Sequence, residues 1–371
     1  MIVTFPHMGT MSIVLQALFE NLECQVLVPP PITKRTMELG TRFSPETVCL
    51  PFKLTLGNFI EALEQGADTL VTCGGVGPCR LGYYGTIQQE LLEQLGYQFR
   101  MIMVEPDLVK IYRQLNYFAP HKNWYEVYKA FRLAGCKMNL LDELGREMNR
   151  LRAYEAKAGS LDSLWDEARR EIILANNCQT VNNLRERLLQ RVKAVRLVQR
   201  STVLRIAIVG EIYVMLEPFV NQNLERRLGS MGAEVFRTMS LTDYVKGQLL
   251  RRQSYLDLYK KLSVMANPYL GHPVGGHALK SIAYTVFQKQ QGYDGIIQVY
   301  PFTCMPEVIA KNILPKVSQD VDMPVLTLAY DEQTGEAGMM TRLEAFIDLL
   351  KYRKAKLDKV SHVGNAIGQQ Q

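Results

Sequence analysis

The sequence has no uninterrupted apolar segment of the ~20 residues that a membrane-spanning helix needs. Residues 1–6 carry no basic leader, so we expect no signal peptide and a cytoplasmic protein without membrane contact. Seven cysteines in a chain without an export signal are expected to be free thiols or metal ligands, because disulfides are rare inside cells.

Signatures of several common enzyme classes are also missing. Without GxxxxGK or GxGxxG, ATP or NAD binding is unsupported, and neither HExxH nor GxSxG occurs. No CxxC pair is present, which disfavours zinc ribbons and thioredoxin-like redox sites. The ferredoxin run CxxCxxCxxxC is absent as well.

Charge of one sign is only slightly in excess. The net charge is +6, from 43 Lys and Arg against 37 Asp and Glu. The basic runs at 185–200 and 351–356 are not accompanied by a basic–aromatic motif, so we expect solvated helix faces and no nucleic-acid partner. The 47% hydrophobic and 22% charged residues are typical of a soluble globular protein, and 371 residues suffice for two or three domains.

Strand and helix patterns alternate in two separate parts of the chain. The alternation fills the first hundred residues, stops in a Leu-, Arg- and Glu-rich helical stretch, and resumes near residue 204. This pattern predicts an α/β fold: two parallel-sheet (Rossmann-like) lobes with a helical segment between them. The predicted divisions are 1–106 (first lobe), 107–200 (helical subdomain), 201–353 (second lobe) and 354–371 (a frayed polar tail).

The expected elements follow from apolar periodicity. Strands are expected at 2–5, 24–28, 68–72 and 99–104, then at 204–209, 234–236, 295–299 and 324–328. Helices are expected at 11–22, 52–65, 83–95, 124–132, 140–156, 161–175 (capped by Ser160), 181–198, 216–231, 241–265, 277–290, 306–316 and 341–351.

Four cysteines lie at or just past predicted strand ends, or at the start of a helix, beside Gly or Pro. They are Cys49, Cys73, Cys79 and Cys304. Ligands of open parallel sheets bind outside the carboxyl ends of the strands, so all four thiols would converge if the two lobes face one another. The pattern predicts a thiolate-bound metal centre, with an iron–sulfur cluster as the favoured cofactor.

Five residues separate Cys73 from Cys79, and they include three glycines and one proline. Such a loop folds tightly, and its backbone amides can point at sulfur or at an anion. Amide donors stabilise iron-bound thiolates and tune their potential. The alternative is a structural glycine turn that carries two incidental cysteines.

The remaining polar candidates are weaker. Cys24, Cys136 and Cys178 fit ordinary buried or partly buried thiols. The loop containing His272 and His277 could supply a proton donor, although helix capping is the favoured interpretation. The acidic candidates end strands or start helices, where carboxylates are stabilising in any case; they are Glu211, Glu307 and residues 331–336.

Four segments together resemble a known family, the proteins related to 2-hydroxyacyl-CoA dehydratases and their activators, also described as acyl-CoA dehydratase activase-related or CoA protein activase. The segments are Cys49-Leu-Pro-Phe-Lys53, Gly77-Pro-Cys-Arg-Leu-Gly-Tyr-Tyr84, Pro301-Phe-Thr-Cys-Met-Pro-Glu307 and Asp331-Glu-Gln-Thr-Gly-Glu-Ala-Gly338 with Thr341-Arg-Leu-Glu-Ala-Phe346. They span both lobes, and the helical segment contributes little.

The resemblance implies a two-lobed protein of anaerobic metabolism that binds a 4Fe–4S or double-cubane cluster in the cleft. Position by position, Cys49, Cys79 and Cys304 match as ligands, and Cys73 is a candidate fourth. The resemblance also implies a partner, a separate ATP-hydrolysing activator of the sugar kinase/heat-shock chaperone/actin type. This chain lacks that partner's phosphate motifs.

Three functions follow as alternatives. The first is a redox protein that passes electrons at very low potential. The second is a dehydratase-like lyase, in which an iron with an open position binds an acyl-CoA. The third is a non-enzymatic accessory subunit that docks the ATPase. The sequence leaves open a homodimer in which a cluster bridges two protomers.

Overall fold

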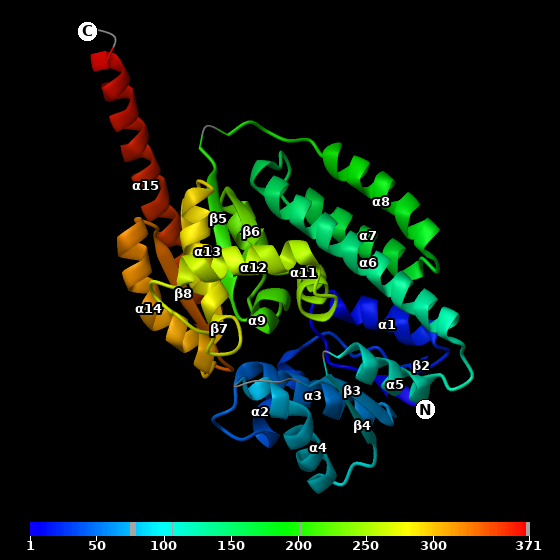
Figure 1. The fold of residues 1–371 in the computed structure, drawn as a ribbon. Coiled ribbons are helices and arrows are strands. Elements are labelled where there is room, and N and C mark those ends of the chain that lie inside the picture. Colours follow the sequence, from blue (N-terminus) through cyan, green and yellow to red (C-terminus); the bar gives the residue numbers. More distant parts are fainter. Residues whose placement is uncertain (75–78, 106, 201, 369–371) are drawn as a thin grey trace.

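The computed structural model describes residues 1–74, 79–105, 107–200 and 202–368. The protein is α/β with two four-stranded parallel sheets (Figure 1), which confirms the predicted fold class. The strand orders are β2-β1-β3-β4 and β6-β5-β7-β8, so the two lobes share one topology. In each sheet, the second strand lies on one side of the first strand and the third strand lies on the other side. Ligands of parallel sheets bind at such a switch point, outside the carboxyl ends of the strands.

The strands of the first lobe are β1 (Ile2–Thr4), β2 (Gln25–Val26), β3 (Thr69–Cys73) and β4 (Arg100–Val104). Its helices are α1 (Met11–Asn21), α2 (Lys34–Phe43), α3 (Leu50–Glu64), the short 3-10 helix η1 (Arg80–Tyr83), α4 (Tyr84–Gln94) and α5 (Leu108–Phe118). Helix α2 is absent from the sequence-based expectations because it is short and mainly polar, and the two residues that it buries, Thr36 and Gly40, are not large apolar residues.

Helices α2 and α3 pack with their backbones in contact. A Cβ on Gly40 would lie 1.8 Å from the carbonyl oxygen of Lys53, and one on Gly57 would lie 2.0 Å from that of Thr36. Only glycine allows this approach. Because α2 holds α3 this closely, it also fixes Cys49, the residue that precedes α3.

The helical segment contains α6 (Trp124–Leu151), η2 (Arg152–Tyr154), α7 (Ser160–Leu174) and α8 (Cys178–Lys193). Two helices were expected here, at 124–132 and 140–156, whereas α6 is one continuous helix. Lys137 interrupts the apolar pattern, yet it lies on the buried side and its Nζ donates to the carbonyl of Ile173 at 2.9 Å. The expected cap Ser160 is the first helical residue, and Gly159, at φ +83°, occupies the cap position.

A disulfide joins Cys136 of α6 to Cys178, the first residue of α8. Their Cα atoms are 5.9 Å apart, a distance that a disulfide spans. The expectation of free thiols is therefore wrong for this pair, because 42 residues of sequence separation hide the contact. Cys24 is buried and free, as expected.

Helix α6 packs against both lobes. Its apolar residues share a cluster with Ile13 of α1 on one side. On the other side, Met138 packs with Leu216 and Leu241 of the second lobe. Figure 1 shows α6 running beside α1 and continuing along the second lobe.

The strands of the second lobe are β5 (Leu204–Gly210), β6 (Ala233–Arg237), β7 (Gly295–Pro301) and β8 (Val325–Tyr330). Its helices are α9 (Ile212–Leu216), α10 (Leu224–Ser230), α11 (Leu241–Tyr244), the π-helical turn η3 (Val245–Leu249), α12 (Gln253–Ala266), α13 (Ala278–Gln290), α14 (Met305–Val321) and α15 (Glu336–Gly368).

Two expectations for the second lobe are corrected. Of the single helix expected over 216–231, only α10 is helical beyond Leu216, where α9 ends, because the chain turns through positive φ at Gln222 and Asn223 before α10 begins. The polar tail expected to fray from residue 354 instead continues α15 to Gly368.

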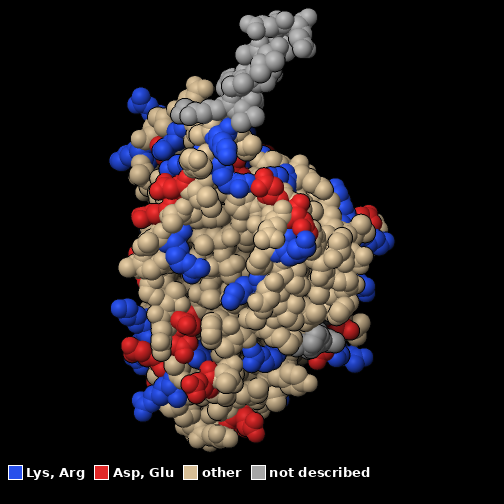
Figure 2. Space-filling model, turned by 90° about the vertical axis from the view of Figure 1, so that its left-hand side faces the viewer, with Lys and Arg blue, Asp and Glu red and all other residues tan. Residues whose placement is uncertain are grey.

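In the described ranges, no helix combines the length and the apolar character needed to cross a membrane. Figure 2 shows Lys and Arg interspersed with Asp and Glu on the face that it presents. This face has no extended area of one charge sign.

Candidate functional site

Three of the four candidate cysteines occupy the residue immediately before a helix. Cys49 precedes α3, Cys79 precedes η1 and Cys304 precedes α14. None of the three side chains accepts a capping hydrogen bond from its own helix. The thiols are therefore not used as helix caps, although the first N–H groups of a helix lack intrahelical partners.

Arg80 connects the segments that carry these cysteines. It follows Cys79 directly. Its Nη1 donates to the carbonyl oxygen of Thr47 at 3.1 Å, and its Nη2 donates to that of Thr303. Thr47 lies two residues before Cys49, and Thr303 directly precedes Cys304. One guanidinium group thus brings segments of both lobes to the same place.

The electrostatic surroundings of the thiols also indicate proximity. Burial raises the pKa of Cys304, and negative charge on Glu211, Glu307 and Cys49 raises it further. Burial likewise raises the pKa of Cys49. The hydrogen bond from Tyr84 and the charge of Arg80 lower the pKa of Cys49, whereas negative charge on Glu211 and Cys79 raises it. Cys49 is therefore within electrostatic reach of both other cysteines.

Two carboxyl groups belong to the same surroundings. Glu211 follows β5, and its carboxylate accepts the N–H groups of Tyr213 and Val214 at 3.0 Å. Glu307 is fully buried and accepts hydrogen bonds from Ser281 and Gln298. Burial raises the pKa of Glu307 to about 7, those hydrogen bonds lower it, and the charge of Glu211 raises it. Sequence reasoning named both as weak candidates only.

Cys73 shares an effect on Tyr244 with Cys79 but does not act on the other two thiols. It is the last residue of β3, where it pairs with Val104, and it remains exposed. Neighbouring protein atoms raise the pKa of Cys73, and no other thiol contributes to that shift. Burial raises the pKa of Tyr244 in α11, and negative charge on Cys73 and Cys79 adds to the effect. The expected glycine loop between the two cysteines includes residues 75–78, which lie outside the described residues.

The site also includes residues that sequence reasoning missed. The hydroxyl of Tyr84 contacts the thiol of Cys49, and the buried Oγ1 of Thr303 has no hydrogen-bond partner among the described residues. Arg80 and Tyr84 belong to the segment at 77–84, one of those that carry the family resemblance. Their closeness to Cys79 in the sequence is the signal that could have identified them. No comparable signal marks Tyr244.

The segments at 49–53 and 331–338 meet through an ion pair between the lobes. The Nζ of Lys53 lies 2.6 Å from Oε1 of Glu332, and the lysine side chain is 5% exposed. This pair joins the helix that begins after Cys49 to the loop that follows β8. It holds the two lobes together beside the cysteine site.

The histidine loop packs against α14 and leaves the start of α13 uncapped by a side chain. A Cβ on Gly276, at φ +51°, would lie 2.9 Å from Cγ of Pro306. His277 occupies the residue before α13 without accepting a capping hydrogen bond, so the favoured capping interpretation is wrong for this side chain. Burial lowers the pKa of His277 to about 3, and the charge of Lys280 lowers it too.

His277 is expected to make stability depend on pH. Its pKa in the folded protein is below its value of 6.5 in the unfolded chain, so the unfolded state takes up the proton first as the pH falls. The stabilising effect is complete above pH 6.5 and is lost progressively toward pH 3. Urea unfolding of His277→Gln should lack this loss, which amounts to ~2 kcal/mol at pH 5.

The control for this measurement is His121→Gln, because the side chain of His121 is 64% exposed. It should keep the pH dependence of the wild type. An unchanged pH dependence in His277→Gln would show that the pKa of His277 is the same in the folded and the unfolded chain.

Within residues 1–74, 79–105, 107–200 and 202–368, no three His, Cys, Asp or Glu side chains are arranged to hold a single metal ion. In a four-iron cluster each cysteine binds a different iron, so its ligands are spaced more widely than those of one ion. The absence of a single-ion site among these residues therefore does not test whether the cysteines bind a cluster, and the sulfur atoms that they supply are the relevant observation. No protein-family model matches the sequence, and no curated protein is significantly similar to it.

Proposed function

We propose that the chain is an iron–sulfur protein that transfers electrons at low potential, with Cys49, Cys79 and Cys304 as cluster ligands. The observation that carries this proposal is the double hydrogen bond of Arg80 to Thr47 and Thr303. It brings three cysteine-bearing helix starts together from two lobes. Thiolates are the usual ligands of iron–sulfur clusters.

The charges at the site support this choice of cofactor. Acidic groups gather there, and burial raises the pKa of Cys49, Cys304, Glu211 and Glu307. Arg80 is the cation that lowers the pKa of Cys49. A bound metal centre would supply the missing positive charge and deprotonate the thiols. The unpartnered hydroxyl of Thr303 is a donor that could serve a neighbouring sulfur.

The chain's own residues would position and shield such a cofactor. Arg80 fixes the positions of the cysteine segments relative to one another. Tyr84 contacts Cys49, and Cys304 is only 9% exposed, so access of water to these thiols is limited. When bound, an iron–sulfur cluster supplies one-electron oxidation and reduction. The reductant that we propose is the separate ATP-hydrolysing activator implied by the sequence resemblance.

A cluster-dependent acyl-CoA lyase is the second candidate, and the position of Cys73 favours it. Cys73 affects neither Cys49 nor Cys304 electrostatically. If three thiols hold the cluster, one iron keeps a position that a substrate could occupy. The Cys73→Ala variant tests the lyase candidate: retained iron shows that three thiolates hold the cluster and leave an iron that a substrate could reach, whereas lost iron adds Cys73 as a fourth ligand and counts against the lyase.

The test is anaerobic reconstitution with ferrous iron and sulfide, followed by iron analysis and EPR after dithionite reduction. The wild type is expected to bind iron and give a cluster signal. Cys49→Ala, Cys79→Ala and Cys304→Ala should each lose most of the iron, because thiolate ligands are removed. Cys24→Ala is the matched control and should retain it, since Cys24 is buried in a separate cluster of the first lobe.

Two results would contradict the proposal. One is wild-type protein that takes up no iron under these conditions. The other is Cys304→Ala with the iron content and the EPR signal of the wild type.

A further inference from the structure

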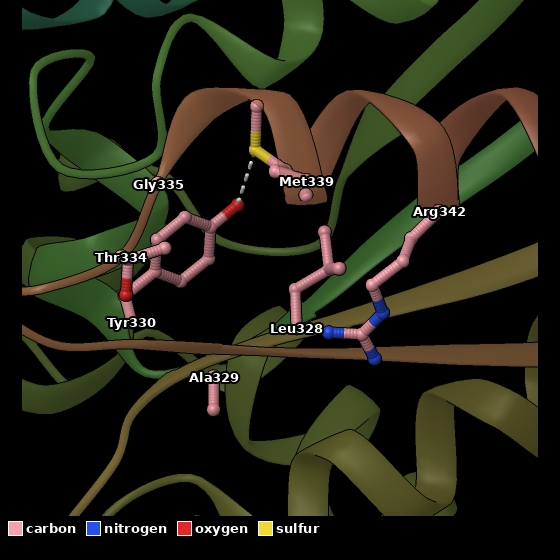
Figure 3. A pocket seen from close by; sticks show the side chains of 8 residues that line it. Leu328, Ala329, Tyr330, Thr334, Gly335, Met339 and Arg342 are labelled. Atoms are coloured by element: carbon pink, nitrogen blue, oxygen red, sulfur yellow. Dashed lines mark hydrogen bonds between the residues drawn. The ribbon is translucent and has the colours of Figure 1, made fainter.

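A cavity of about 220 Å³ lies between the end of β8 and the first turns of α15 (Figure 3). None of its lining residues belongs to the cysteine site. The cavity is partly open to solvent, and its volume is large enough for a small organic molecule. The sequence resemblance includes the segment at 331–338 but assigns no role to it.

One end of the cavity is positively charged. In Figure 3 the side chain of Arg342 extends from α15 toward β8 and places its guanidinium group beside Leu328. Nη2 donates to the carbonyl oxygen of Thr327 at 2.6 Å, and no carboxylate of the described residues forms an ion pair with it. Glu336, in the first turn of α15, is paired with Arg227 instead. The charge of Arg342 is therefore available to a ligand.

A buried hydroxyl lines the same cavity. Tyr330 is 1% exposed, and the partner of its hydroxyl is the thioether sulfur of Met339 at 3.4 Å, a weak acceptor (Figure 3). Buried hydroxyl groups are normally satisfied by stronger partners. Burial raises the pKa of Tyr330, and the positive charges of Arg342 and Arg227 lower it. This hydroxyl thus lies in a positive field that favours an anionic acceptor.

Apart from Thr334, whose hydroxyl is hydrogen-bonded to Asp331, the rest of the cavity wall is apolar or lacks side chains. Leu328 and Tyr330 rise from β8 toward α15, whereas Ala329 points away (Figure 3). Met339 covers the cavity from α15. A Cβ on Gly338 would have no neighbouring atom within 4 Å. An apolar wall beside one cation fits an organic anion with a short hydrocarbon part better than an inorganic ion.

We propose that this cavity binds a small aliphatic carboxylate. The carboxylate accepts hydrogen bonds from the guanidinium of Arg342 and from the Tyr330 hydroxyl, and the hydrocarbon part lies against Leu328 and Met339. The arginine fork matches a carboxylate in shape and charge. The proposal is independent of iron binding, since it uses none of the cysteines.

Isothermal titration calorimetry of the full chain with acetate, butyrate and hexanoate tests the proposal. Saturable binding of at least one of them is expected, with neutral butyramide binding at least about tenfold more weakly because it lacks the charge. Arg342→Met should weaken carboxylate binding by at least about tenfold for the same reason. Gly338→Val should abolish it in a folded protein, because the new side chain grows into open space.

The matched control is Lys351→Met, which removes one exposed positive charge farther along α15. It should bind the carboxylates as the wild type does. The proposal is overturned if none of the three carboxylates binds the wild type, or if Arg342→Met binds them equally well. Saturable binding of inorganic phosphate without any carboxylate binding would overturn it in favour of an oxyanion site.

Discussion

The Gly40→Ala protein is expected to be strongly destabilised or unfolded. Its new methyl carbon would lie 1.8 Å from the carbonyl oxygen of Lys53, whereas real contacts of this kind exceed 3.0 Å. The clash is with backbone, so no side-chain rotation can relieve it, and α2 must move away from α3. We expect a loss of more than about 4 kcal/mol in the free energy of unfolding, measured with urea.

The control for Gly40→Ala is Gly135→Ala in α6. A Cβ at Gly135 has no atom within 4 Å, and alanine is the better helix former. This variant should gain up to ~1 kcal/mol in stability. If Gly40→Ala unfolds at the urea concentration of the wild type, the close packing of α2 on α3 is wrong, and so is its role in placing Cys49.

Glu217→Ala is expected to loosen the two lobes from each other. The buried carboxylate accepts the N–H of Gly9 at 2.7 Å and lies 2.8 Å from Nδ1 of His7, both in the first lobe. It also accepts the N–H of Phe219 in its own lobe at 3.1 Å. Alanine leaves these groups buried without a partner, which costs roughly 3 kcal/mol in the free energy of unfolding.

Two further variants define the origin of this loss. Glu217→Gln keeps an acceptor oxygen and should recover part of the stability. Glu344→Ala removes an exposed carboxylate of α15 and should stay within ~0.5 kcal/mol of the wild type. Glu217→Ala with the stability of Glu344→Ala would show that the contact at Gly9 and His7 does not hold the lobes together.

The architecture could be predicted because it follows from local patterns. Alternating strands and helices in residues 1–106 and 201–353 imply parallel sheets, and both sheets are present. A proline two residues after Cys49 and after Cys304 indicates the start of a helix, and both cysteines do precede helices. The rule that parallel strands end at one edge then places these cysteines on the same side of their sheets.

What could not be predicted depends on contacts between distant segments. The disulfide joins residues 42 positions apart, and nothing in either local sequence marks the partner. Glu211 lies near the thiols only because β5 ends opposite α3, which no periodicity reveals. Helix α2 owes its place to the glycine contact with α3, a tertiary contact that its mainly polar sequence does not reveal.

The continuous helix α6 has a consequence for how the protein can move. Because a single rigid rod is packed into the apolar clusters of both lobes, a hinge rotation would pull its side chains out of at least one of them. Clamshell opening, common in two-lobed α/β proteins, is therefore disfavoured here. Molecules that reach the groups between the lobes must do so through local displacement of loops, while the distance between the two lobes stays constant.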